Sequence, residues 1–344
     1  MDQERLRTTA RTMVTPGQGI LAMDESTPTC GKRLQAAGVE NTEDNRRAYR
    51  SLLLGTPGLG DYISGAILYD ETIRQKTTGG IPFPDLMQKQ DILVGIKVDT
   101  GAKEFALHSG EKITEGLDGL RERLNEYKTL GARFCKWRAV ITIDQNLPSR
   151  ACIEANAHAL ARYAALCQEA DLVPIVEPEV LLDGDHSINT CYTVTIETQR
   201  TVFEQLYRQG VYFGGMVLKP SMVLSGKESR QRAGIQQVAE MTLQCLQQTV
   251  PASVPGIAFL SGGQSDEEAT QHLNAMNLIA KKQVLPWQLT FSYARALQHV
   301  ALGTWKGQAA NIEQAQKNLL LRARLNALAS QGTYSQEMEQ QEAA

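Results

Sequence analysis

Short apolar runs recur along the chain, and this recurrence constrains the fold more than any other feature of the sequence. Each run has the length of a buried β-strand, and most of them end in a polar residue. We expect strands at residues 19–23, 62–69, 92–96, 132–135, 172–176, 216–219, 256–260 and 288–291. Amphipathic or alanine-rich segments, expected to be helices, lie between them at residues 116–130, 150–170, 195–208, 232–248, 265–281 and 311–329.

This alternation of strands and helices favours parallel pairing with right-handed crossovers. Eight strands indicate one closed (β/α)8 TIM barrel, which we place at residues 1–330. An open sheet that binds a dinucleotide would need G-x-G-x-x-G after its first strand, and the sequence around Gly19 does not match. Residues 331–344 are polar and acidic, so we expect a flexible C-terminal tail.

The composition excludes several classes of protein. The formal net charge is −3 and no long run of either sign occurs, which argues against a nucleic-acid or membrane surface. The six cysteines are scattered and the five histidines have no paired metal-ligand spacing, so we expect reduced thiols, no metal and no cofactor. No signal core or membrane-spanning run is present. We expect a cytoplasmic protein, or a protein of the plastid stroma if a transit peptide has been removed.

Lys219 ends the sixth expected strand, immediately before Pro220. An ammonium group at a buried strand end is unfavourable unless it is paired or gives up its proton. A lysine that loses its proton near neutral pH is a nucleophile for carbonyl compounds. The alternative, on this stretch alone, is a lysine that points into solvent.

Ionisable side chains gather at the expected strand ends, where barrel enzymes carry their functional residues. These ends supply Asp24, Lys97, Lys136, Arg138, Glu177, Glu179, Lys219 and Ser261. Lys136 is expected to be a cationic neighbour that favours a neutral amine at Lys219, and Glu177 to transfer protons, with Asp24 as a second acid or base. We expect Glu177 and Glu179 to project to opposite faces of their strand. A structural network of ion pairs at the rim is the alternative.

Two further groups of residues could bind anions. The turn Ser261-Gly262-Gly263 leads into a helix with a capping box at Ser265, and Arg295 lies just past the eighth strand. Barrels commonly hold phosphate after strands seven and eight. Lys32 and Arg33 could form a second cationic site, although a solvated helix face would look the same.

Six motifs, found in order, give the chain a close resemblance to the class I (Schiff-base, metal-independent) fructose-bisphosphate aldolases from about residue 5 to residue 330. They are GILAMDES (residues 19–26), GIKVD (95–99), KWR (136–138), IVEPE (175–179), VLKP (217–220) and FLSGGQS (259–265). The resemblance implies a homotetramer that acts on sugar phosphates.

The resemblance also implies roles for matching residues. Lys219 is similar to the Schiff-base lysine, Glu177 to the main general acid/base, Lys136 to its partner in proton transfer, Glu179 to a supporting carboxylate, and Asp24 to the aspartate that handles the released hydroxyl. The phosphate of the dihydroxyacetone half would meet Ser261, Gly262, Gly263, Ser292 and Arg295. Residues toward the second phosphate would be Lys32, Arg33, Arg46, Lys97 and Arg138. In departures from the family, Tyr334 is the aromatic residue nearest the end of the chain, and Ala294 stands where a glycine is expected.

The leading hypothesis is therefore reversible cleavage of fructose 1,6-bisphosphate to dihydroxyacetone phosphate and glyceraldehyde 3-phosphate, in glycolysis, gluconeogenesis or carbon fixation. A transaldolase-like transferase would use the same imine chemistry. A non-catalytic scaffold that keeps an aldolase shell is the alternative from a different class.

Overall fold

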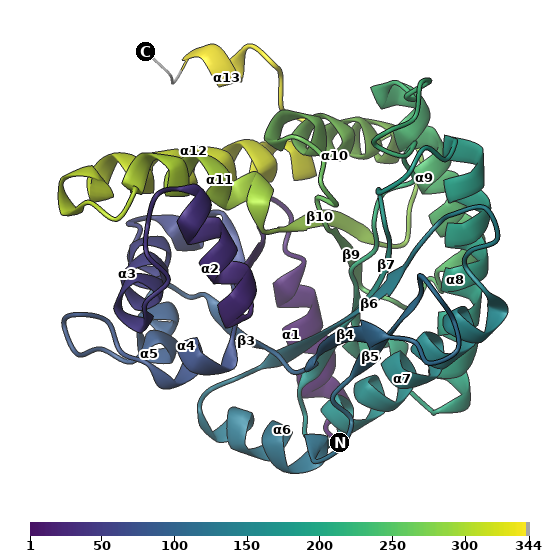
Figure 1. Cartoon of the computed structure of the whole chain (residues 1–344), viewed down its shortest axis with the longest axis horizontal. Helices are drawn as coiled ribbons and strands as arrows, with labels where there is room; N and C mark the ends of the chain where they lie inside the picture. Colours follow the sequence, from purple (N-terminus) through teal and green to yellow (C-terminus); the bar gives the residue numbers. More distant parts are fainter. Residues whose placement is uncertain (342–344) are drawn as a thin grey trace.

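The computed structural model describes residues 1–341, and its eight parallel strands close into a barrel (Figure 1). Around the barrel the strands are β1 (Gly19–Ala22), β2 (Ile63–Leu68), β3 (Leu93–Lys97), β6 (Phe134–Ile141), β7 (Val173–Val180), β8 (Val217–Leu218), β9 (Gly256–Phe259) and β10 (Gln288–Tyr293). Pairing of β10 with β1 closes the ring. The predicted (β/α)8 barrel is confirmed. No helix within the described residues is long and apolar enough to cross a membrane.

Helices connect successive strands and form the outer layer seen in Figure 1. They are α2 (Thr27–Ala36), α3 (Glu43–Leu54), η1 (Leu59–Asp61), α4 (Asp70–Arg74), α5 (Phe83–Gln88), α6 (Leu120–Thr129), α7 (Arg150–Glu169), α8 (Ile188–Arg208), η2 (Phe213–Gly215), α9 (Ile235–Thr249), α10 (Asp266–Ala280), α11 (Arg295–Trp305), η3 (Ala309–Asn311) and α12 (Ile312–Ser330). The expected capping box at Ser265 begins α10. Helix α8 begins at Ile188 rather than at residue 195, because the Ser187 side chain caps it by accepting from the Thr190 amide.

The barrel interior is packed at its N-terminal end. Helix α1 (Gln3–Met13) places Leu6, Ala10 and Met13 in one apolar cluster with side chains from the strands. Phe134 belongs to the same cluster, and a Cβ at Gly95 would lie 2.2 Å from its ring, so only glycine fits there. Because this end is closed, the opposite, C-terminal end of the strands is left for a cavity.

The strand lengths differ from the expectation where polar side chains face the barrel mouth. Strands β6 and β7 continue through Lys136 and Glu177, where the first polar residue was expected to end them. Strand β8 is shorter and contains only Val217 and Leu218. The hairpin of β4 (Gly101–Glu104) and β5 (Lys112–Glu115) was not predicted, because its strands are short, largely polar and partly exposed.

The described part of the expected tail is docked on the barrel. Both carboxylate oxygens of Glu339 accept from the Arg322 guanidinium of α12, at 2.6 and 2.7 Å. The buried Tyr334 hydroxyl donates to the same carboxylate at 3.0 Å, and α13 (Met338–Gln341) follows. The sequence predicts a flexible tail from residue 331, whereas these contacts give residues 334–339 a defined position. Residues 342–344 of that prediction lie outside the described part of the chain.

Candidate active site

A cavity of about 880 Å³ opens at the C-terminal end of the barrel strands. Its lining includes most of the ionisable residues expected from the sequence: Asp24, Lys32, Arg33, Lys97, Lys136, Arg138, Glu177, Glu179, Lys219 and Arg295. Ser261, Gly262 and Ser292 complete the wall on the side of β9 and β10. The strand-end rule therefore locates the cavity, since these residues come from all around the barrel.

Lys219 lies at the bottom of this cavity and is only 3% exposed. Its backbone N–H donates to the Val176 carbonyl at 2.8 Å, which extends the pairing of β8 with β7 by one residue. Its Nζ lies 3.2 Å from Glu177 Oε1. The alternative in which this lysine points into solvent is thereby excluded.

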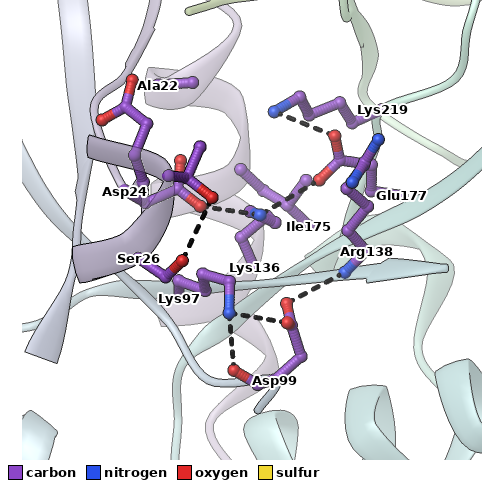
Figure 2. A network of polar contacts seen from close by, with 12 residues as sticks. Ala22, Asp24, Ser26, Lys97, Asp99, Lys136, Arg138, Ile175, Glu177 and Lys219 are labelled. Carbon is purple, nitrogen blue, oxygen red and sulfur yellow. Dashed lines mark hydrogen bonds and ion pairs between the residues drawn. The ribbon is translucent and has the colours of Figure 1, made fainter. Parts of the chain in front are cut away.

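Glu177 joins two lysines within the buried part of the cavity (Figure 2). Its Oε2 lies 3.4 Å from Lys136 Nζ, and the same ammonium lies 2.7 Å from Asp24 Oδ2. Lys136 therefore bridges Asp24 and Glu177, while Glu177 bridges Lys136 and Lys219. The result is a continuous chain of four ionisable groups, which lie just after β1, in β6, in β7 and just after β8, and along which protons can move.

The charges in this chain follow from the contacts. Burial opposes the positive charge of Lys136, but Asp24 and Glu177 outweigh it and raise the pKa of the amine above its ordinary value. Burial would likewise raise the pKa of Asp24, yet Lys136 and then Lys219 overcome this effect and lower it to about 2. At neutral pH, Lys136 is an ammonium and Asp24 is a carboxylate.

Glu179 lies on the same wall as Glu177, contrary to the expectation that the two face opposite sides. Both line the cavity, because residues two apart on a strand share a face. Glu179 accepts from Arg138 Nε of the neighbouring strand β6. Burial opposes the guanidinium charge, but Glu179 outweighs it and raises the pKa of Arg138. Glu179 therefore orients Arg138 toward the cavity.

Two carboxylates outside the predicted site residues hold two further cavity cations, Arg33 and Lys97. Glu25 accepts from Arg33 and, at 2.6 Å, from the buried Arg50 Nη1. Asp99 Oδ1 lies 2.7 Å from Lys97 Nζ, and its Oδ2 accepts from the Arg138 amide at 3.2 Å. Both acids follow expected strand ends closely in the sequence, so the strand-end rule could have included them.

Arg46 does not reach the cavity. Its guanidinium donates to both carboxylate oxygens of Glu71, at 2.6 and 2.9 Å, and to Asn41 at 2.8 Å. These contacts account for the position of the Arg46 guanidinium. Arg46 is absent from the residues that line the cavity. The structure therefore gives no support to the expected contact with the second phosphate.

The wall formed by β9 and β10 suits an anion. Residues Ser261–Gln264 form a tight turn, in which the backbone N–H of Gln264 donates to the Ser261 carbonyl at 3.0 Å. Both central residues, Gly262 and Gly263, have positive φ (57° and 87°). Gly263 lies beside this wall: a Cβ on it would be 3.4 Å from Arg295 Nη2. The Ser292 hydroxyl is buried without a protein partner, so it is free to bond a ligand.

Ala294 fits the position where a glycine was expected. Its φ is −103°, which an L-amino acid adopts without the strain of a left-handed conformation.

Within residues 1–341, no three histidine, cysteine, aspartate or glutamate side chains gather as a set of metal ligands. The cavity contains the buried amine of Lys219, the carboxylates of Asp24 and Glu177 on either side of Lys136, and cations on two sides.

Comparisons with known proteins agree with this geometry. The family model described as fructose-bisphosphate aldolase class-I matches residues 5–344. A "Probable fructose-bisphosphate aldolase class 1" of Xanthomonas campestris is 58% identical over 97% of this chain and 99% of that relative. A chloroplastic fructose-bisphosphate aldolase of Chlamydomonas reinhardtii is 52% identical over 99% of this chain and 89% of that relative.

Solved structures give the same result. A fructose-bisphosphate aldolase of Plasmodium falciparum, determined in complex with TRAP and a small-molecule inhibitor, superposes with a TM-score of 0.95 at 48% identity. The alignment covers 97% of this chain and 96% of that one. The chain belongs to the class-I fructose-bisphosphate aldolase family.

Proposed function

We propose that this chain catalyses the reversible aldol cleavage of fructose 1,6-bisphosphate to dihydroxyacetone phosphate and glyceraldehyde 3-phosphate, through a Schiff base on Lys219. The observation that carries the proposal is the position of Glu177 between two buried lysines, 3.2 Å from Lys219 Nζ and 3.4 Å from Lys136 Nζ. A nucleophilic amine and its proton-transfer partner are the minimal set for imine formation.

The first half of the reaction forms the imine. The neutral amine of Lys219 attacks the ketone carbon C2 and gives a carbinolamine, whose oxygen must gain a proton before it leaves as water. The Glu177 carboxylate, 3.2 Å from Lys219 Nζ, takes the proton that the amine must lose before it attacks and returns it to this oxygen, and the Lys136 ammonium beside it shares the proton network. The product is a protonated imine, which withdraws electrons from the C3–C4 bond.

The second half breaks that bond. The C4 hydroxyl gives its proton to Asp24 or Glu177, the C3–C4 electron pair moves into the iminium to form an enamine, and glyceraldehyde 3-phosphate leaves. Protonation of the enamine at C3 and hydrolysis of the imine then release dihydroxyacetone phosphate and restore the Lys219 amine. Asp24 is suited to accept because it is ionised at neutral pH and lies in contact with Lys136.

The two phosphates take opposite sides of the cavity in this proposal. Ser261, Gly262, Gly263, Ser292 and Arg295 would bind the phosphate of the dihydroxyacetone half, and Lys32, Arg33, Lys97 and Arg138 would face the second. Arg33, Lys97 and Arg138 each pair with a carboxylate in the structure, which holds the cations in place before substrate arrives. Glu179 supports the site through Arg138.

An assay for triose release tests the proposal. Purified protein given fructose 1,6-bisphosphate and no acceptor sugar is expected to release both triose phosphates, and Lys219→Met is expected to fold normally without turnover. Release that depends on an added acceptor aldehyde would indicate a transaldolase-like transferase. Unchanged turnover in Lys219→Met would contradict the proposed nucleophile, and absence of turnover in the wild-type protein would favour the scaffold reading.

We further propose that the protein is a homotetramer of the cytoplasm or, after removal of a transit peptide, of the plastid stroma. The support is the family membership and the chloroplastic names of several relatives. Light scattering coupled to size-exclusion chromatography is expected to give a mass four times that of the 37.9 kDa chain, and a monomeric mass would contradict the tetramer.

A further inference from the structure

Gln264, the last residue of the Ser261–Gln264 turn, has a side-chain amide that lies beneath the turn and makes contacts in three directions. Its Nε2 donates to the Ser261 carbonyl at 2.9 Å and lies 3.6 Å from Met222 Sδ. Its Oε1 lies 2.5 Å from His272 Nδ1 in helix α10. All four residues are at least nine-tenths buried, so these contacts are shielded from water.

The direction of each hydrogen bond is fixed by the groups involved. The Ser261 carbonyl can only accept, so the nitrogen of the Gln264 amide must face it. The amide oxygen then faces His272, and the ring must donate from Nδ1. Burial lowers the pKa of His272 to about 4, so the imidazole stays neutral at physiological pH and holds a single N–H for this bond.

Loss of the imidazole donor would leave Gln264 Oε1 buried without a hydrogen-bond partner, and reversal of the amide could not relieve this. With the amide reversed, its oxygen would face the Ser261 carbonyl oxygen, and two acceptors would be opposed in a buried site. Apart from the backbone hydrogen bond from Gln264 to Ser261, the interior of the turn consists of Gly262 and Gly263, the residue type with the most backbone freedom. Through Met222, the same amide also contacts the segment that begins with Lys219.

We propose that His272 is a positioning residue for the phosphate of the dihydroxyacetone half, acting through Gln264 on the Ser261–Gly263 turn and its place relative to Lys219. This inference rests on the proposed function, in which that turn binds the phosphate. His272 itself is absent from the cavity lining. It sets the geometry of the turn and takes no part in the chemical steps.

Paired substitutions at His272 separate this role from simple packing. His272→Leu removes the donor, whereas His272→Asn keeps an N–H close to the position of Nδ1. We expect His272→Leu to raise KM for fructose 1,6-bisphosphate and the Kd for dihydroxyacetone phosphate about tenfold, the equivalent of one buried hydrogen bond, with kcat changed much less. His272→Asn is expected to stay close to wild type in both constants.

A double-mutant cycle tests the route through Gln264. Gln264→Met conserves volume and removes both hydrogen bonds, so we expect it to raise KM by itself and His272→Leu to add nothing further in that background. Thr270→Val is the matched control on α10, since its hydroxyl bonds Asp266 and Asn326 and not the turn. It is expected to lower the melting temperature without changing KM.

Three results would overturn the inference while leaving the proposed function intact. They are an unchanged KM in His272→Leu, equal effects of His272→Leu and His272→Asn, and additive effects of the His272 and Gln264 substitutions in a protein that still cleaves the bisphosphate. If His272→Leu does not fold, His272→Asn and Gln264→Met test the inference in its place. A wild-type KM in both of these variants would also overturn the inference. Absence of triose release by the wild-type protein would instead refute the proposed function.

Discussion

Asp24→Asn should separate carbon–carbon cleavage from imine formation. The fold lowers the pKa of Asp24 from 3.8 to about 2, a difference that corresponds to about 2 kcal/mol in favour of the carboxylate. Because the folded-state pKa is depressed, this stabilisation is present above about pH 4 and is lost as the pH falls toward 2. Asparagine resembles protonated aspartate, so the variant should be about 2 kcal/mol less stable at pH 7.

The same substitution removes the acceptor for the C4 hydroxyl proton. We expect kcat for cleavage to fall by roughly 100- to 10,000-fold, the usual range for a general base. Lys219 and Glu177 keep their contact, so borohydride should still trap dihydroxyacetone phosphate on the variant. Denaturant unfolding, a coupled triose assay and the trapping reaction measure the three quantities.

Asp99→Asn is the matched comparison, because Asp99 also pairs with a cavity lysine but lies on the side assigned to the second phosphate. It should raise KM more than it lowers kcat. The reasoning would be refuted if Asp24→Asn kept wild-type turnover, if it lost trapping as completely as cleavage, or if its stability at pH 7 equalled that of the wild-type protein.

Four further predictions follow from the same contacts. Arg33→Met should raise KM for fructose 1,6-bisphosphate about tenfold or more and leave KM for fructose 1-phosphate, which lacks the second phosphate, unchanged. An equal rise in KM for both substrates would contradict this. Glu339→Gln should cost about 1–2 kcal/mol, because Arg322 loses its charged partner, and should speed proteolysis of the tail; an unchanged melting temperature would refute it. Burial lowers the pKa of His272 from its ordinary value of 6.5 to about 4, so the free energy of unfolding should fall by about 3 kcal/mol as the pH drops from 6.5 to 4, with Glu268 and Arg232 as the neighbouring charges. His272→Asn should lack that dependence, and urea unfolding at several pH values measures it. EDTA should leave activity unchanged, since the proposed mechanism uses only side chains; inactivation reversed by a metal would contradict the mechanism.

The barrel could be predicted because a buried parallel strand leaves a clear apolar run in the sequence. The cavity residues could be predicted from the rule that barrels concentrate function at strand C-termini, which brings Lys219, Glu177 and Asp24 together. The predicted strand ends were less accurate, because Lys136 and Glu177 are polar yet lie within their strands and face the barrel mouth.

Hydrogen bonds and ion pairs between side chains of different elements cannot be predicted from a periodic pattern in the sequence. The bond between Gln264 and His272 joins a turn to a helix, and neither residue type signals a pairing. The docking of Glu339 on Arg322 likewise depends on how the chain returns over α12. The family resemblance predicts Arg46 in the cavity, but its partner Glu71 lies in another helix, and no sequence pattern links the two residues.

Borohydride reduction in the presence of dihydroxyacetone phosphate, followed by peptide mapping, tests the central claim most directly. A covalent adduct on Lys219, absent from Lys219→Met, is the expected result, because this buried amine lies 3.2 Å from the Glu177 carboxylate that would complete imine formation. An adduct on Lys136 or another lysine, or no adduct in protein that actively releases triose phosphates, would contradict it.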